Sequence, residues 1–560
     1  MPNMPRRRAV NVCSSCHNHK IRCDVDSTSI PCSKCSELGE ECTLRARKQY
    51  RSRKRLRRVS KSSIDDEHVI NPLSAPSHLD PAKIVAAAIT EPSSRTAPIF
   101  VGDGGYGAIL DATGDVTDRH FHVPAAAEKA LAAEDLEYLK VKGCFSLPSK
   151  SSELLKAYFQ FVHPSFPIID GPSFLRDYAA GGLEGINLLL LWSMFSVSAS
   201  YIPLSFRKAV KESCVHRAKL LFDMSQENDK IVLVQSSLLL SFWFADTEDV
   251  KQSWYWTSIA FGIAQTLGLH REVKTTHGQV SIEQRSLWRN IWWCCMIRDV
   301  WLAFGMGRPL RINASDCDCP APSYSDCQFS DMVFHDEALY SAAEVVGHVS
   351  IWQSLVTTSN VLRDILTTKA PSPTFVKALE AQINTEATLT ATSLLRRADL
   401  HLRLHQQATL IALARCSGNK DKSKAAAEAT TAIVQAFLDD NTTAYVAPVA
   451  VPLLIPAMVT YLATTRSKRP DARKLGHETL EIYTRFLSTL EDNYPAASIV
   501  KQLFAAAQAS IDGKDSKRDR QDRLTPDGQS SSSWDVEWPF GIDYSRWIPG
   551  GDSLADIGNA

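Results

Sequence analysis

Six cysteines near the N-terminus occur as two copies of one pattern. The spacing C-x2-C-x6-C appears in Cys13, Cys16 and Cys23, and it returns after eight residues in Cys32, Cys35 and Cys42. A spacing repeated to the residue indicates a structural requirement on where the sulfurs lie, and metal chelation is the usual one. Zinc prefers four tetrahedral ligands and binds thiolates strongly.

Six thiolates can serve one zinc ion with two left over, or two ions through four terminal and two bridging sulfurs. The duplicated half-motif favours the second arrangement, because each half then has the same role. A segment this small buries little core, so we expect its fold to depend on the metal, worth about 10–16 kcal/mol in comparable small sites. The sequence therefore predicts two Zn2+ ions bound by Cys13, Cys16, Cys23, Cys32, Cys35 and Cys42.

Charge is distributed unevenly along the chain. The formal net charge of the 560 residues is zero, but residues 1–61 carry 16 Lys and Arg against 5 Asp and Glu, a net charge of +11, and the remainder carries −11. A basic arm joined to an acidic body indicates a polyanionic partner for the arm alone. The N-terminus has no apolar stretch after its charges and is not a secretory signal, which favours reduced cysteines over disulfides.

The two halves of the cysteine pattern differ in charge. The first half is cationic between Cys16 and Cys23, whereas the second contains three glutamates before Cys42. If the module meets DNA, the first half must face it, and Lys20 can donate to guanine O6 and N7 in the major groove. The basic run that follows can contact phosphates and can also serve as a nuclear import signal. The candidate DNA contacts are Lys20, Arg22, His17, His19, Arg45, Arg47, Lys48, Arg51 and Arg53.

The cysteine spacing resembles the fungal binuclear Zn2Cys6 cluster. Lys20 and Arg22 before the third cysteine, Asp24 after it and Pro31 before the fourth strengthen the resemblance. It implies two zinc ions bridged by the first and fourth cysteines, here Cys13 and Cys32. It also implies a helix in the major groove that reads CGG-type triplets, mainly through Lys20. The chain departs from the family at His17 and His19, where arginine or lysine is usual.

We expect an all-α protein with a small N-terminal metal module. Frequent prolines and glycines interrupt the region after the basic run, helical apolar spacing dominates the long central region, and acids mix with aromatics at the C-terminus. The predicted organisation is a Zn2Cys6 DNA-binding domain (1–42, cluster 13–42), a basic extension with a nuclear localisation signal (43–61), a disordered linker (62–131), a helical domain (132–510) and a disordered acidic-aromatic tail that acts as an activation segment (511–560).

Parts of the helical region resemble the middle homology region of fungal transcription factors. The resemblance covers roughly 150–320 and lies in stretches such as Trp254-Tyr255-Trp256 and Trp288 to Asp299, followed by Gly305-Met-Gly307-Arg308-Pro309. It is nearest to the cutinase and fatty-acid-utilisation regulators. It implies an all-α regulatory domain that senses small-molecule effectors and binds transcription co-regulators.

For several individual residues of this helical region the sequence makes more specific predictions. Most of its aromatics are interpreted as core, and we expect Asp299 to pair with Arg308 or Arg285 in the interior. Cys317, Cys319 and Cys327 are interpreted as ordinary thiols, because no second ligand motif accompanies them. No nucleophile or orienting base accompanies His270, so we expect no enzyme activity.

Two uncharged segments, 185–206 and 443–465, are long enough for a membrane span. We interpret both as buried helices and expect no membrane partner. In the second, Pro448, Pro452 and Pro456 should each break a helix.

The leading hypothesis is a nuclear, sequence-specific regulator of RNA polymerase II transcription, which activates a secondary-metabolite gene cluster. An alternative is a regulator of fatty-acid, cutin or other carbon catabolism genes. An alternative from another class is a zinc-containing protein-interaction or ligand-binding scaffold. Expected partners are double-stranded DNA, co-regulators and an effector. A homodimer is a further alternative, although no coiled-coil heptads follow the basic run.

Overall fold

The computed structural model consists of two compact units, Met1–Pro76 and Ser77–Ala560. The described residues are mostly helical, which confirms the predicted fold class. The basic run from residue 45 and the tail beyond Asp522 lie outside them. The structure describes residues 13–18, 21, 23–25, 30–39, 41–44, 96–102, 108, 119–124, 131–182, 186–204, 207–224, 229–243, 252–273, 280–368, 371–383 and 392–522.

In the smaller unit the structure describes two short helices, α1 (Ser14–Asn18) and α3 (Ser33–Leu38). An isolated antiparallel bridge joins Cys13 to Leu44, so that the two ends of the cysteine segment meet. Among its described residues, the buried side chains are the six cysteines and Val25. So small an apolar core cannot order the segment by itself.

The larger unit begins with a strand pair inside the range in which the sequence predicted only a linker. β1 (Thr96–Phe100) and β2 (His120–Pro124) are antiparallel, with Thr96 opposite Pro124. His120 Nε2 lies 3.0 Å from the carbonyl oxygen of Gly268, and the Phe100 ring packs against His270. A Cβ at Gly268 would lie only 2.4 Å from Phe100, and its φ of +75° also favours glycine. These contacts hold the strand pair on the helical body, a feature that no local pattern revealed.

The first half of the helical body surrounds an apolar core. Helix α9 is almost entirely buried, because large apolar residues surround its axis and its only polar side chains are three serines. The long helix α13 carries four tryptophans, three of them at most 4% exposed, so most of its aromatics form core as predicted. The elements of this half are α6 (Ala133–Val141), α7 (Ser151–Ala157), η1 (Tyr158–Val162), η2 (His163–Ser165), α8 (Gly171–Gly181), α9 (Leu188–Ser198), α10 (Arg207–Met224), α11 (Lys230–Leu240), α12 (Ser253–Thr266) and α13 (Ile282–Met306).

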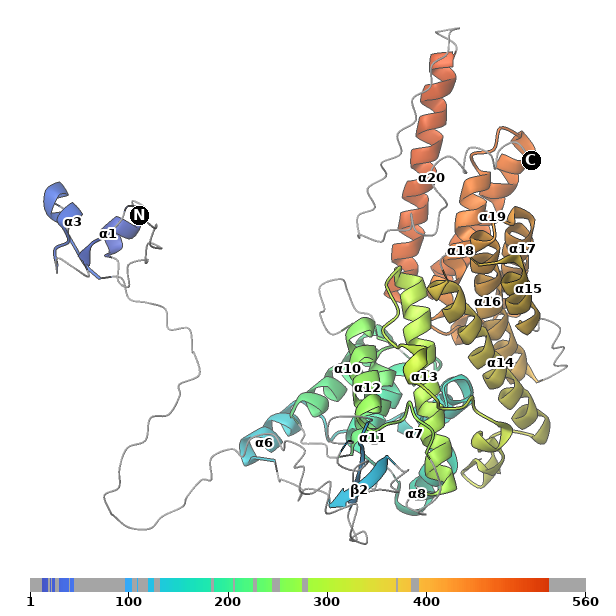
Figure 1. The fold of residues 1–560 in the computed structure, drawn as a ribbon, viewed down its shortest axis with the longest axis horizontal. Coiled ribbons are helices and arrows are strands. Elements are labelled where there is room, and N and C mark those ends of the chain that lie inside the picture. Colours follow the sequence, from blue (N-terminus) through green and yellow to red (C-terminus); the bar gives the residue numbers. More distant parts are fainter. Residues whose placement is uncertain are drawn as a thin grey trace. The chain divides into compact units, whose positions relative to one another are not determined.

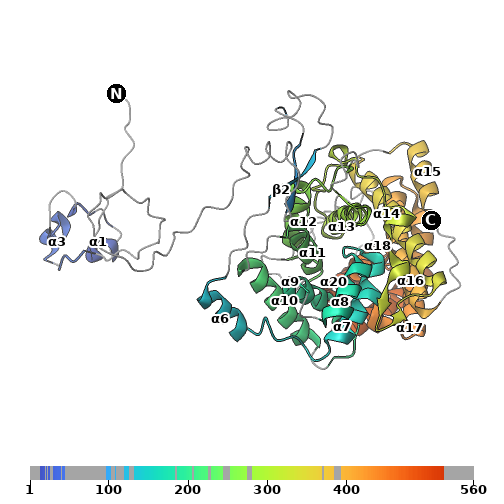
Figure 2. The ribbon, with the colours of Figure 1, turned by 90° about the horizontal axis from the view of Figure 1, so that it is seen from below.

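A connection of short elements leads to the second half, a stack of antiparallel helices. Figures 1 and 2 show α14–α19 gathered beside the group formed by α8–α13. Helix α16 packs against α14, α17 and α18. The elements are η4 (Ala314–Asp316), η5 (Tyr324–Asp326), η6 (Phe329–Asp331), β3 (Val333–Phe334), β4 (Glu337–Ala338), α14 (Ala342–Thr367), α15 (Pro373–Gln382), α16 (Ser393–Cys416), α17 (Lys420–Asp439), η7 (Thr443–Tyr445), α18 (Ala450–Thr464), α19 (Pro470–Leu490) and α20 (Pro495–Asp522).

Many of these helices begin at a polar cap that the sequence supplies. The side chain of the capping residue accepts a backbone N–H from the first turn, which satisfies a donor that has no partner within the helix. Ser341 forms a full capping box with Glu344 at the start of α14. At the other end of the domain, α20 extends to Asp522, beyond the predicted boundary at 510. Further caps are Asp170, Asn187, Asp229, Ser281, Ser372 and Asn419.

None of the helices in the described part of the chain is both long and apolar enough to cross a membrane. The two uncharged segments instead supply the buried helices α9 and α18. The prediction that prolines break the second segment was wrong for two of them, because Pro452 and Pro456 both lie within α18. Pro452 sits in the first turn, where its missing N–H has no acceptor in the helix. The carbonyl of Pro456 accepts a hydrogen bond of 2.7 Å from Arg415 Nη2, and the buried surroundings hold the helix together.

The predicted partner of Asp299 was also wrong. Its carboxylate pairs with Arg311, at 2.6 Å between Oδ1 and Nε, and accepts the backbone N–H groups of Arg311 and Ile312 at 2.9 and 3.0 Å. Helix α13 ends at Gly307, whose φ of 62° reverses the chain and brings residue 311 back onto the helix. Arg308 instead lies over the Trp254 ring, 5.0 Å from its centroid.

Four buried histidines of the body are neutral. Burial lowers the pKa of His163 to about 3 and the pKa values of His348, His401 and His405 to about 4, because the protein interior disfavours imidazolium. The unfolded chain takes up these protons near pH 6.5. The stability that these groups contribute is therefore fully present above pH ~6.5 and is lost as pH falls toward their folded pKa values.

We expect the melting temperature of the helical body to fall between pH ~7 and ~5, since each histidine contributes a slope of up to about 1.4 kcal/mol per pH unit. His348→Phe should reduce this slope, because it removes one titrating group whose ring nitrogens have no hydrogen-bond partner among the described residues. The partly exposed His477, whose side chain is 38% exposed, serves as the control through His477→Gln. Calorimetry at several pH values measures the slopes, and equal slopes for wild type and His348→Phe would contradict the assignment.

Candidate metal centre and DNA-binding module

The two short helices of the smaller unit place the cysteines in equivalent positions. Helix α1 begins directly after Cys13, and α3 begins directly after Cys32. The backbone N–H of Cys16 therefore points at Cys13 Sγ, 3.4 Å away. The same conformation brings the N–H of Cys35 to the sulfur of Cys32.

A second pair of hydrogen bonds repeats between the halves. The N–H of Cys13 donates to Cys23 Sγ at 3.5 Å, and the N–H of Cys32 donates to Cys42 Sγ at 3.3 Å. In each half the donor and the acceptor are ten residues apart in sequence. The structural repeat thus matches the repeat in the sequence, and each half presents its sulfurs in the same way.

The sulfurs of Cys13, Cys16, Cys32 and Cys35 converge. All four lie within 4.8 Å of one another, and every one of these side chains is buried. The closest pairs are 3.5 Å (Cys16–Cys32), 3.6 Å (Cys13–Cys35) and 3.8 Å (Cys13–Cys32) apart. Two sulfurs on one zinc ion, with bonds of ~2.3 Å in tetrahedral geometry, lie roughly 3.8 Å apart. The donor set and its spacing therefore fit zinc.

The cysteines differ in how readily they ionise. The pKa of Cys13 is lowered to about 6, chiefly by the N–H of Cys16, and the pKa of Cys32 is lowered chiefly by the N–H of Cys35. Burial raises the pKa of Cys16 above its ordinary value and that of Cys35 to about 12. Metal binding requires thiolates. The two sulfurs whose pKa is lowered are the two that the family resemblance assigns as bridging.

Contacts outside the cysteines close the module. The N–H of Ser33 donates to Asp24 Oδ1 at 3.1 Å, and the N–H of Ser14 donates to the carbonyl of Thr43 at 2.8 Å. Cys23 and Cys42, at 3% and 8% exposure, complete the same buried cluster. Asp24 therefore positions the start of α3.

The structure leaves the predicted DNA contacts untested. His17 lies in α1, but its side chain is outside the described residues. His19, Lys20 and Arg22 also lie outside them, as do Arg45, Arg47, Lys48, Arg51 and Arg53. These positions stay predictions.

The three later cysteines of the connection between the halves make ordinary thiol contacts. The sulfurs of Cys317, Cys319 and Cys327 lie 3.3–3.8 Å from the backbone carbonyls of Asn313, Pro320 and Ser323. They do not converge on one point with other metal-ligating side chains among the described residues.

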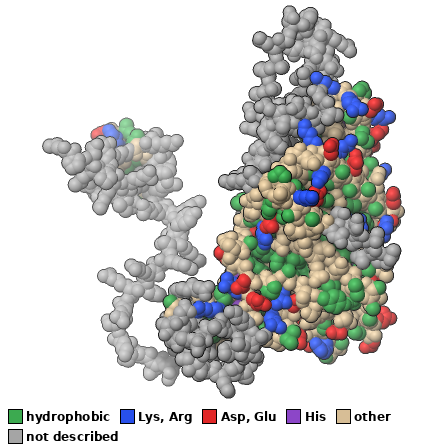
Figure 3. Space-filling view, turned by 45° about the vertical axis from the view of Figure 1, so that its right-hand side comes forward, with side chains coloured by type: hydrophobic (Ala, Val, Ile, Leu, Met, Phe, Trp, Pro, Cys, Tyr) green, Lys and Arg blue, Asp and Glu red, His purple; other side chains and the backbone are tan. Residues whose placement is uncertain are grey.

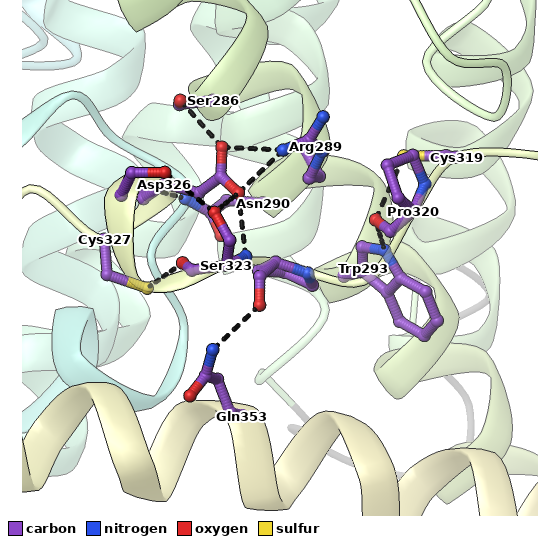
Figure 4. A network of polar contacts seen from close by, with 12 residues as sticks. Ser286, Arg289, Asn290, Trp293, Cys319, Pro320, Ser323, Asp326, Cys327 and Gln353 are labelled. Atoms are coloured by element: carbon purple, nitrogen blue, oxygen red, sulfur yellow. Dashed lines mark hydrogen bonds and ion pairs between the residues drawn. The ribbon is translucent and has the colours of Figure 1, made fainter.

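A buried carboxylate that no sequence pattern predicted holds this connection on α13. Asp326 is 5% exposed and accepts from Ser286 Oγ at 2.8 Å and from Arg289 Nη1 at 2.7 Å, and its backbone carbonyl accepts from Asn290 Nδ2 (Figure 4). The three donors, Ser286, Arg289 and Asn290, lie close together on α13. Polar residues within this tryptophan-rich helix indicate that a buried polar partner exists, but that partner is 36 to 40 residues away in sequence.

Comparison with protein families agrees with both units. Residues 11–51 match the fungal Zn(2)-Cys(6) binuclear cluster domain, and residues 155–392 match the fungal specific transcription factor domain. The chain thus combines the two domains that characterise fungal Zn2Cys6 transcription factors. The predicted resemblance is confirmed, and the second match extends past the predicted limit of 320 to include α14 and α15. The binuclear cluster domain binds two zinc ions.

Characterised members of this family are similar over much of the chain. Cutinase transcription factor 1 beta of Fusarium vanettenii is 27% identical over 62% of this chain and 48% of its own length. The fusaric acid cluster transcription factor FUB12 of Gibberella moniliformis is 23% identical over 57% of this chain and 56% of its own length. The chain thus spans about half the length of these relatives.

Among solved structures, the K. lactis CBF3 core matches with a TM-score of 0.44 and 13% identity, over 70% of this chain and 91% of the other. This likeness is too low to support a functional argument.

Proposed function

We propose that this Zn2Cys6 transcription factor binds specific DNA sequences in the nucleus and regulates RNA polymerase II transcription, without enzymatic activity. The observation that carries the proposal is the duplicated, buried cysteine cluster within a basic arm of net charge +11. A double-stranded nucleic acid is the polyanion that such an arm suits. Over the visible face of the larger unit, Lys and Arg are instead interspersed with Asp and Glu (Figure 3).

In this proposal all six cysteines bind the two zinc ions, with Cys13 and Cys32 bridging. The cluster then carries a charge of −2, which nearby cations offset. Lys20 donates to guanine in a CGG-type triplet, while Arg22, His17 and His19 contact the same site. Phosphate contacts come from Arg45, Arg47, Lys48, Arg51 and Arg53, and the same run directs nuclear import.

Lys20→Ala should reduce discrimination between a CGG-containing duplex and a scrambled one by roughly 10- to 100-fold, the range expected for one specific base contact. Zinc content should not change. Lys34→Ala is the matched control, because Lys34 lies in the acidic half and pairs with Glu37 at 2.6 Å. Competitive binding of labelled duplexes to the whole chain measures the ratio. Equal effects of the two variants would contradict a base-reading role for Lys20.

Selection of bound oligonucleotides by the whole chain, with and without a chelator, tests the wider proposal. We expect a CGG-type motif that is lost with the chelator. Failure to enrich any motif while zinc is bound would favour the scaffold alternative, in which the zinc module binds protein.

For the target genes we propose a secondary-metabolite biosynthetic cluster, which the chain activates through its acidic-aromatic tail. Similarity to the fusaric acid cluster factor, over a comparable share of both chains, supports this assignment. The higher identity to a cutinase factor favours a second candidate, the regulation of cutin, fatty-acid or other carbon catabolism genes. Promoter occupancy across the genome distinguishes the two, since the first predicts sites confined to contiguous biosynthetic genes.

A further inference from the structure

A large cavity opens between the two halves of the helical body. It contains about 1010 Å3 of space free of protein atoms, counting its mouth. Its walls come from η1, α13, α14 and α16, and from the segment around η7. Most of the wall is aromatic or aliphatic, and a concave apolar lining with a few polar groups is typical of small-molecule sites.

The charged side chains in this wall are two arginines, Arg298 and Arg397, and among the described residues that line the cavity there is no Asp or Glu. Arg298 is 6% exposed, and its guanidinium donates to the hydroxyl and the carbonyl of Ser241 at 2.9 and 2.6 Å. Both partners are neutral. Among the described residues, no acidic side chain is paired with Arg298, and an uncompensated charge is unfavourable inside a protein.

Arg397 projects from α16 beside a stack of aromatic rings. Its guanidinium lies 4.5 Å from the centroid of Tyr445 and 5.2 Å from that of Phe161. Phe161 itself stacks between Tyr201 and Tyr445, with interplanar angles of 19° and 25°. The buried Arg397 Nε has no hydrogen-bond partner within the described part of the chain. The cavity thus places the positively charged guanidinium of Arg397 next to a flat wall of aromatic rings.

The histidines that line the cavity add no positive charge at neutral pH. His401 accepts the N–H of Ala447 on Nε2 at 2.8 Å and lies 2.7 Å from the Arg397 carbonyl through Nδ1, which fixes a neutral tautomer. His348 and His405 also line the cavity, and burial lowers the pKa of each to about 4. At neutral pH the charge of the wall therefore comes from the two arginines.

We propose that this cavity binds a small organic anion, with an apolar and preferably aromatic body and one carboxylate or similar acidic group. The acid pairs with the Arg397 guanidinium, whose planar donors suit a carboxylate, and the body packs against Phe161 and Tyr445. Arg298 contributes further positive potential. This assigns a site and a chemical class to the effector expected for the helical domain. Its regulatory meaning rests on the proposed function, whereas binding itself does not.

The test compares two probes of nearly the same shape, para-butylbenzoate and para-butylbenzamide, by calorimetric titration of the whole chain. We expect the benzoate to bind at least about tenfold more tightly than the amide, because only the benzoate pairs with a guanidinium. Arg397→Gln should weaken benzoate binding by a similar factor and leave amide binding unchanged. Arg396→Gln is the matched control, since the neighbouring Arg396 is exposed and pairs with Asp440 at 2.6 Å.

Thermal unfolding without ligand shows whether each variant is folded, and Ala398→Phe, which fills the cavity, should abolish binding of both probes. Equal affinity for the two probes, no benzoate binding, or unchanged benzoate binding in Arg397→Gln would each overturn the proposal. If Arg397→Gln fails to fold, the affinities of the wild-type chain for the two probes still test whether the cavity prefers an anion. Oligonucleotide selection on the same preparations distinguishes the cavity proposal from the proposed DNA-binding function. If a preparation selects its DNA motif but binds no benzoate, only the cavity proposal is contradicted.

Discussion

Replacing Cys32 with serine is expected to release both zinc ions and to abolish DNA binding by the whole chain. Cys32 Sγ lies 3.5 Å from Cys16 Sγ and 3.8 Å from Cys13 Sγ, where a sulfur shared by two ions would sit. Where the structure describes this unit, its apolar core consists of the cysteines and Val25. Loss of the metal therefore removes about 10–16 kcal/mol, more than any other interaction available to so small a module.

Metal analysis of the purified chain measures this effect. We expect two zinc ions per wild-type chain and none in Cys32→Ser. Cys416→Ser is the control, because Cys416 is exposed in the helical body and should leave both ions in place. The main unfolding transition of the helical body should be the same in all three proteins, since the cluster belongs to a separate unit. Two ions in Cys32→Ser would disprove the bridged arrangement.

Asp299→Asn is expected to destabilise the helical body by about 3–5 kcal/mol, the usual effect of breaking a buried ion pair. The amide keeps the size of the carboxylate but loses its charge, and its NH2 group faces donors. Arg311, stacked at 3.7 Å over Trp254, would then retain a poorly compensated charge. The Asp299 side chain is 1% exposed, so water cannot replace the lost partner.

Chemical denaturation of both the variant and a surface control measures this difference. Asp318→Asn removes the same charge from a pair with Arg271 at 3.3 Å, but that carboxylate is 54% exposed. An exposed pair is worth ~0–1 kcal/mol. If the two variants lose similar amounts of stability, Asp299 does not anchor the segment after α13.

Short sequence patterns correctly predicted the features that depend on residues close together in the chain. The cysteine spacing predicted a two-zinc module, and the apolar segment at 185–206 predicted a buried helix, which is α9. The same reasoning failed where distant contacts decide the outcome. The strand pair at residues 96–124 depends on Gly268 and His270, and Pro456 lies within α18 because packing holds the helix on both sides of it.

By itself the sequence determined the zinc chemistry and the charge of the N-terminal arm, because metal ligands a few residues apart and a run of like charges act over short distances along the chain. Only the tertiary structure decided that Asp299 meets Arg311 and that Arg298 and Arg397 share one cavity. The directions of these side chains follow from a left-handed turn at Gly307 and from the packing of α13 against α14 and of α14 against α16. Such placements depend on all the neighbours at once, which no short pattern records.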